Sequence, residues 1–219
     1  MSIHILGVTL DSELNMNRHV RETVAGCNAL VRALRHIRPC LSQHVATTLS
    51  CAIVQTRLDY CNSLLHATSS QNITSLQRVQ NNLARIVYRT HRRASAGPLL
   101  EKLHWLPISS RIKFKLATLS HAVIHTGSPD YLAELVSTSG GSRRTRGNPD
   151  LCSGASLSQV QNHGAQKLLE PRCKLASEKP SFRFASPAVW NSLPLALRLV
   201  TSPTTFRRAL KTELFTQSV

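Results

Sequence analysis

Arginine is the residue type whose spacing in this sequence most clearly predicts a chemistry. Arg78, Arg85, Arg89 and Arg92 stand at offsets of 0, 7, 11 and 14. In an α-helix each residue turns by about 100°, so these offsets place the four side chains on one face. Guanidinium groups bind phosphate oxygens through two parallel hydrogen bonds. The spacing therefore predicts a helix face that contacts the phosphates of a nucleic acid.

Two smaller groups of cations strengthen this expectation. Arg32, Arg35 and Arg38 recur at three-residue steps, and Arg111 and Lys115 form an i,i+4 pair. The chain has 27 Lys and Arg against 11 Asp and Glu, a formal net charge of +16. Such a surplus attracts polyanions: nucleic acid first, an anionic membrane second, with a solvated basic surface as the alternative that needs no ligand. We expect a nucleic acid as partner, and no membrane, with phosphate contacts at Arg32, Arg35, Arg38, Arg78, Arg85, Arg89, Arg92, Arg111 and Lys115.

The acidic residues predict that the chain is not an enzyme. Asp11, Asp59, Asp130 and Asp150 are its only aspartates, and they are far apart in the sequence. Two-metal phosphoryl transfer needs carboxylates that converge on ions about 3.5–4 Å apart. The sequence predicts no such group, and we assign no catalytic residue.

No metal site or cofactor is expected either. His121 and His125 have an i,i+4 spacing, but no Glu follows His121 as in HExxH, so packed or half-exposed histidines are the favoured interpretation. Cys61 and His66 likewise lack a recognised metal-binding pattern, so no metal site is expected there either. No two of the six cysteines have the CxxC spacing of a zinc site, and those in helical stretches are expected to be reduced, small and buried.

Helices must position these residues. Aromatic residues make up 5% of the chain, so Leu, Val, Ile and Ala must form the core, which favours a mainly α fold. A second helix should begin after Ser42 as N-cap and carry Val45, Leu49, Ile53 and Leu58 on its apolar side. Hydrophobic periodicity predicts one short strand or hairpin arm over 3–10 and helices over 15–38, 59–66, 71–91, 111–125, 130–136 and 203–215.

Composition predicts where the domains lie. Five of the nine glycines fall in 137–164 with many Ser and Thr and the basic run 143–146, which is typical of a flexible linker. A small hairpin is expected over 166–185, and the Trp-containing segments 103–108 and 187–194 are expected to be packing anchors. We expect four parts: an N-terminal β element (1–14), a helical domain (15–136), the linker (137–164) and a small, loosely ordered C-terminal subdomain (165–219).

The sequence also predicts a location inside the cell. The N-terminal residues lack the basic and apolar regions of a signal peptide. No stretch approaches the roughly 18 apolar residues of a membrane span. We expect a nuclear or cytoplasmic protein that is not secreted.

Seven phrases, taken in order, resemble one known family. They are LGVTLD (6–11), RLDYCNSLL (57–65), LQRVQN (76–81), LHWLPI (103–108), YLAEL (131–135), PAVWNSLP (187–194) and FRRALKT (206–212). This series resembles the region after the palm in jockey-like non-LTR (LINE-type) retrotransposon reverse transcriptases. The similarity covers nearly the whole chain, but residues 177–182 lack the Gly-Asp-Arg that many relatives carry there.

The resemblance implies a fold and a role. Residues 6–11 would be the strand that leaves the palm, and the helices after it a thumb-like bundle that grips the template–primer duplex. The catalytic palm of an RNA-directed DNA polymerase would lie upstream, so this chain would be a truncated, non-catalytic fragment of a transposable element that could also contact the missing palm and fingers. The alternatives are a non-functional pseudogene product and a domesticated helical interaction protein.

Overall fold

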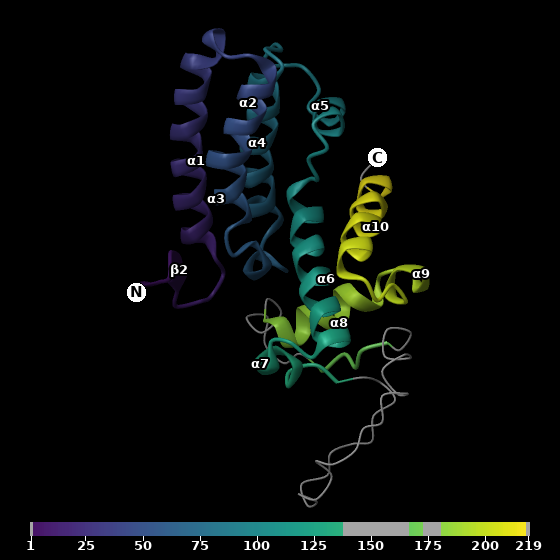
Figure 1. Ribbon diagram of the computed structural model, residues 1–219. Helices are drawn as coiled ribbons and strands as arrows, with labels where there is room; N and C mark the ends of the chain where they lie inside the picture. Colours follow the sequence, from purple (N-terminus) through teal and green to yellow (C-terminus); the bar gives the residue numbers. More distant parts are fainter. Residues whose placement is uncertain (1, 138–166, 173–180, 218–219) are drawn as a thin grey trace, which may run out of the picture. The chain divides into compact units, whose positions relative to one another are not determined.

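The computed structural model describes residues 2–137, 167–172 and 181–217, and these form a mainly helical structure with one short N-terminal sheet (Figure 1). The expected fold class is therefore confirmed. The chain divides into two compact units, residues 1–113 with 213–219 (unit 1) and residues 114–212 (unit 2). This division falls inside a helix. The four-part division expected from composition stays a prediction, and its linker (137–164) lies almost entirely outside the described residues.

The N-terminal segment is a complete hairpin. Strands β1 (Ser2–Ile5) and β2 (Val8–Asp11) pair antiparallel, with Ile5 opposite Val8. Leu6 and Gly7 form the two-residue turn, and both have positive φ. A Cβ on Gly7 would lie 3.3 Å from the ring of Tyr60. Glycine is therefore favoured at this position both by the positive φ and by the close approach of Tyr60. The expected single strand or arm is thus two strands.

Helices α1 (Asn17–Ile37) and α4 (Ser70–Val87) contact each other along unit 1 (Figure 1). Their buried faces follow the predicted apolar periodicity and carry Val20, Cys27, Val31 and Leu34 on α1 and Leu76, Val79, Leu83 and Val87 on α4. Helix α4 ends at Val87, four residues before the expected end. Arg89 adopts a left-handed conformation with φ 51°, which ends the helical path.

The segment between α1 and α4 contains an irregular helix. Ser42 is the N-cap of α2 (Gln43–Ser50), as expected, and its Oγ accepts a hydrogen bond from the Val45 backbone N–H. A π turn, η2 (Cys51–Gln55), joins α2 to α3 (Thr56–Asp59). Four buried residues are spaced by four, Ala46, Ser50, Val54 and Leu58, and Gln55 is buried beside them. The prediction was wrong by one position for Val45, Leu49 and Ile53, of which Val45 is 42% exposed, whereas Leu58 is buried as expected.

Short elements complete unit 1. The 3-10 turn η1 (Arg38–Cys40) follows α1, and η3 (Asn62–Leu65) lies within the predicted 59–66 helix. Helix α5 (Gly97–Lys102) leads to Trp105, which is buried as expected of a packing anchor. Helix α6 (Ile108–Thr126) then passes from unit 1 into unit 2.

Unit 2 is built around two aromatic side chains. Trp190 on α8 (Phe182–Asn191) and Phe206 on α10 (Pro203–Thr216) are fully buried, with ring centroids 6.0 Å apart. Two short helices, α7 (Asp130–Ala133) and α9 (Leu195–Arg198), belong to the same unit. The prediction of a hairpin over 166–185 is wrong from Phe182 onward, because α8 begins there. Residues 173–180 lie outside the described part. Trp190 is an anchor on a helix rather than in a loop.

The four described cysteines are free thiols, and only Cys27 is buried. Burial raises the pKa of the Cys27 thiol, so it stays protonated. Cys40 and Cys51 are exposed, which corrects the expectation that cysteines in helical stretches are buried.

Candidate nucleic-acid interface

A hollow of about 460 Å³ lies where the carboxyl ends of α1 and α4 meet. Five of the nine predicted phosphate contacts line it, together with one histidine and no carboxylate. We call it the arginine pocket, and its lining residues are Arg35, Arg38, Pro39, Asn82, Arg85, Ile86, Arg89, Thr90, His91 and Arg92. The structure thus brings together arginines from two of the groups that the sequence set apart.

Arg38 holds the two helix ends together. Its side chain is buried, and Nη2 donates to the Val87 carbonyl oxygen at 2.6 Å while Nε lies 3.1 Å from the Ile86 carbonyl oxygen. Nη1 donates to the carbonyl oxygen of Leu41 at 2.7 Å. A helix leaves its last carbonyl groups without intrahelical partners, and a cation there is favourable. Arg38 therefore caps α4 and has a structural role, although neutral carbonyls leave its positive charge in the pocket wall.

Arg89 and Arg85 are partly fixed in the same way. Nη2 of Arg89 donates to the carbonyl oxygens of Arg38 and Pro39, at 2.9 and 2.8 Å. Nε of Arg85 donates to the Ala94 carbonyl oxygen at 2.8 Å. The helix-face argument fails for Arg89 because α4 has already ended, yet the left-handed turn at Arg89 directs this residue and Arg92 into the pocket. The residues were predicted, but the reason for their proximity was wrong.

Arg35, His91 and Arg92 are exposed residues of the pocket wall. Within the described residues, neither Arg35 nor Arg92 has a hydrogen-bond or ion-pair partner. Nδ1 of His91 accepts the Arg93 backbone N–H at 3.2 Å, so in the neutral ring Nε2 carries the proton and can donate. These three side chains have donors available for an anion. The contiguous run of His91, Arg92 and Arg93 was the sequence signal for a cationic site beyond the helix.

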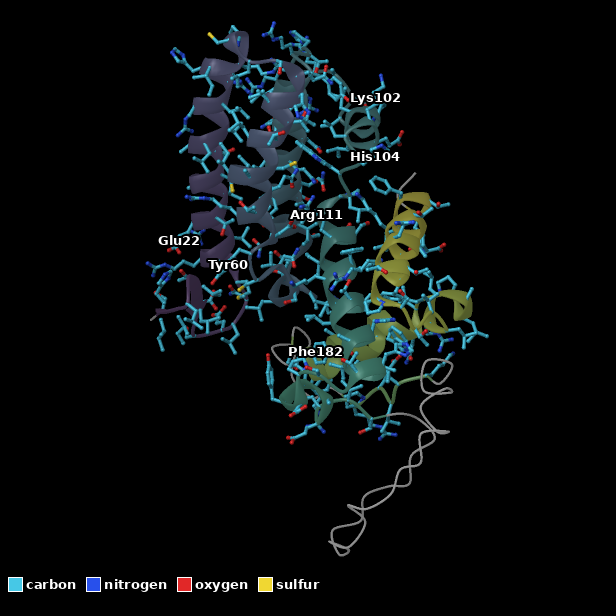
Figure 2. The ribbon with its side chains drawn as sticks, in the orientation of Figure 1. Glu22, Tyr60, Lys102, His104, Arg111 and Phe182 are labelled. Carbon is cyan, nitrogen blue, oxygen red and sulfur yellow. The ribbon has the colours of Figure 1, made fainter. Side chains whose placement is uncertain are left out.

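The four other predicted contacts lie outside the pocket. Arg32 and Arg78 are exposed on α1 and α4, and Lys115 is exposed on α6 in unit 2. Arg111, labelled in Figure 2, forms a two-point ion pair with Asp59, in which Nε donates to Oδ1 at 2.7 Å and Nη2 to Oδ2. Arg111 is therefore neutralised by a carboxylate 52 positions away, a pairing that no local sequence pattern signals.

The opposite end of α1 carries a polar network around the hairpin, which we call the hairpin end (Asp11, Glu22, Asp59 and Tyr60). Thr9 Oγ1 donates to Glu22 Oε2 at 2.5 Å, and Arg18 Nε donates to Glu22 Oε1 at 2.9 Å. Tyr60 OH donates to the Leu6 carbonyl oxygen at 2.6 Å. Figure 2 labels Glu22 and Tyr60. The hydrogen bond from Thr9, and then that from Arg18, lower the pKa of Glu22. This network fastens the hairpin to the helices.

His121 is a packing residue of unit 2. It is 2% exposed, lies 4.2 Å from Phe206 in a stacked arrangement, and its Nε2 donates to the Val200 carbonyl oxygen at 2.7 Å. Burial lowers its pKa, which favours the neutral ring. The interpretation of His121 as a packed histidine is confirmed. In the described part of the chain, no group of three or more His, Cys, Asp or Glu could hold a metal ion.

Comparisons with known proteins found no match among protein-family models, curated proteins or solved structures. Among the described residues, no helix is both long and apolar enough to span a membrane.

Proposed function

We propose that this chain is a non-catalytic region that binds RNA or an RNA/DNA duplex through the sugar–phosphate backbone. The observation that carries the proposal is the arginine pocket, in which five guanidinium groups line one hollow without a carboxylate. A carboxylate partner would neutralise such a cluster, as Asp59 does for Arg111. The unpaired charge favours a polyanion instead.

The parent protein in this proposal is a non-LTR retrotransposon reverse transcriptase, and the chain corresponds to its thumb and the tail after it. Seven phrases in the family's order support this assignment, and a mainly helical fold accords with a thumb. The polymerase activity would belong to a palm outside this chain, which could be a further partner. The protein would act inside the cell, in the nucleus or the cytoplasm.

The test is the salt dependence of binding to a labelled RNA/DNA hybrid, measured by fluorescence anisotropy. Each phosphate contact contributes roughly 0.9 to the slope of log K against log salt on a duplex. We expect the Arg35→Gln/Arg92→Gln double variant to lower the slope by about 2 and to weaken binding to all sequences alike.

The matched control is Arg21→Gln/Lys102→Gln, which removes the same two charges from exposed sites on α1 and α5 that lie outside the pocket. It should leave the slope within about 1 of the parent value. Binding that does not change between low and high salt would contradict the proposed function.

A second candidate is a helical interaction protein, favoured by the exposed apolar side chains of the hairpin. Ile3, Ile5 and Leu6 are 58%, 49% and 85% exposed. Within the described residues, β1 pairs only with β2, which leaves its outer edge open to another strand. Sedimentation of the isolated chain without nucleic acid tests this candidate, because a chain that stays monomeric at high concentration would argue against it.

A further inference from the structure

The shape of the arginine pocket differs from that of a surface that merely follows a nucleic-acid backbone. Pockets of about 300–1,000 Å³ are typical of sites that enclose a small molecule, and the arginine pocket has about 460 Å³. Its wall includes the side chains of Ile86 and Pro39 beside the guanidinium groups. There is room for a nucleotide, with an apolar surface for its sugar or base.

The charge of the pocket favours an anion with more than one negative charge. Arg38 and Arg89 bond to neutral carbonyl oxygens, which fix the side chains without reducing their charge. A phosphodiester within a strand carries one negative charge, whereas a phosphate monoester carries about 1.5 to 2 at pH 7 and has three acceptor oxygens. The monoester therefore matches this carboxylate-free cluster better.

The available donors also suit a group with several acceptor oxygens. Arg35 and Arg92 have no partner among the described residues, and within the same residues Arg89 donates hydrogen bonds through Nη2 alone. In the neutral ring, Nε2 of His91 adds a donor. Because Arg38 and Arg89 are held in place by backbone carbonyls, less side-chain freedom is lost when the anion binds.

We propose that the arginine pocket binds a phosphate monoester on a nucleotide, in preference to the phosphodiesters of a continuous strand. The proposal rests on the proposed function and deepens it. The monoester could belong to the 5′ end of an RNA or DNA strand or to a free mononucleotide.

The test compares two single-stranded oligonucleotides of one sequence, with a 5′-phosphate and with a 5′-hydroxyl, on the full chain at near-physiological salt. We expect the 5′-phosphate to bind about tenfold more tightly, since charge-assisted hydrogen bonds contribute about that much. The Arg35→Gln/Arg92→Gln variant should abolish the difference between the two oligonucleotides, and Arg21→Gln/Lys102→Gln should retain it. Both variants alter exposed side chains, and circular dichroism checks that they fold.

Competition distinguishes the two sources of the monoester. Adenosine 5′-monophosphate that displaces the phosphorylated oligonucleotide, where adenosine does not, shows that a free nucleotide suffices. If the mononucleotide does not compete, the pocket binds the phosphorylated 5′ ends of strands and not free nucleotides.

Equal affinity for the two oligonucleotides would overturn the inference. If both oligonucleotides still bind with a steep salt dependence, the proposed function stands and only the inference of a monoester site fails. A preference that survives in the double variant would also overturn it, because the phosphate would then bind elsewhere. If neither oligonucleotide nor the RNA/DNA hybrid binds, both proposals fail.

Discussion

At the hairpin end of unit 1, arginines lie beside carboxylates; in the arginine pocket, they lie beside backbone carbonyl oxygens. Arg18 pairs with Glu22 and Arg111 with Asp59, whereas Arg38 and Arg89 donate to the carbonyl groups that end α1 and α4. Both environments orient a guanidinium group, but only a carboxylate cancels its charge. The difference shows that the partners of each cation, rather than the number of cations, decide where this chain can bind an anion.

The largest expected effect is on folding and concerns Arg38. The Arg38→Met variant should lose about 3 kcal/mol of the free energy of unfolding, because it leaves buried carbonyl groups without partners. Urea denaturation measures the loss. Arg32→Met, on the exposed side of α1, is the control and should stay within about 0.5 kcal/mol of the parent. Equal losses in the free energy of unfolding for the two variants would contradict the capping role of Arg38.

The ion pair at the hairpin end should matter less. Asp59→Asn should lower the free energy of unfolding by about 1 kcal/mol, because the two-point geometry is favourable but the Asp59 side chain is 42% exposed. The matched comparison is Arg18→Gln, since both side chains of the Arg18–Glu22 pair are largely exposed. Thermal or urea unfolding should show almost no change in stability for Arg18→Gln. If Arg18→Gln lost more free energy of unfolding than Asp59→Asn, the Arg18–Glu22 pair would be the more stabilising of the two.

Acid should weaken the hairpin end through Glu22. Folding lowers the pKa of Glu22, mainly through the hydrogen bond from Thr9. The contribution of Glu22 to stability is therefore complete above the ordinary pKa of 4.5 and is lost as the pH falls through the folded-state value. Thr9→Val should raise the pKa of Glu22, as measured by NMR titration of its side-chain carboxyl. An unchanged pKa would show that the hydrogen bond is not its main determinant.

The smallest expected effect on stability is that of Arg35. Because no partner for it exists among the described residues, Arg35→Gln should change the free energy of unfolding by less than about 0.5 kcal/mol. Any small gain would come from relief of repulsion among the pocket arginines. A loss of the size expected for Arg38→Met would show that Arg35 is structural, which would weaken the case for an anion site.

The elements that sequence analysis predicted well are those with a long apolar stripe. Helices α1, α4, α6 and α10 follow three- and four-residue periodicity, and Ser42 acts as the N-cap that its residue type suggests. Helix α8 was missed because Pro187 lies inside it, and proline normally interrupts a helix. The early end of α4 depends on the left-handed conformation of Arg89, which few non-glycine residues adopt.

For the candidate site, sequence analysis predicted the residue type and not the arrangement. Five predicted arginines do gather, but two of them come after α4 has ended. The partners of Arg38 and Arg111 lie about fifty positions away in the sequence, and such contacts leave no periodic signal. Only the folded chain separates arginines that stabilise the structure from those with donors available for a ligand.

The π turn η2 sets the rotation of the hairpin end about the helix axis. Ala46 and Leu58 are twelve residues apart, so a uniform α-helix would place them about 120° apart around its axis. Both are nevertheless buried, because the wider turn over Cys51–Gln55 compensates for most of that angle. Removing one residue from this turn would leave Ala46 and Leu58 eleven residues apart, which a uniform α-helix places only about 20° apart. The segment would then continue as a regular α-helix with Leu58 still buried and Asp59 still facing Arg111. The π turn therefore holds one residue more than the packing of this segment requires.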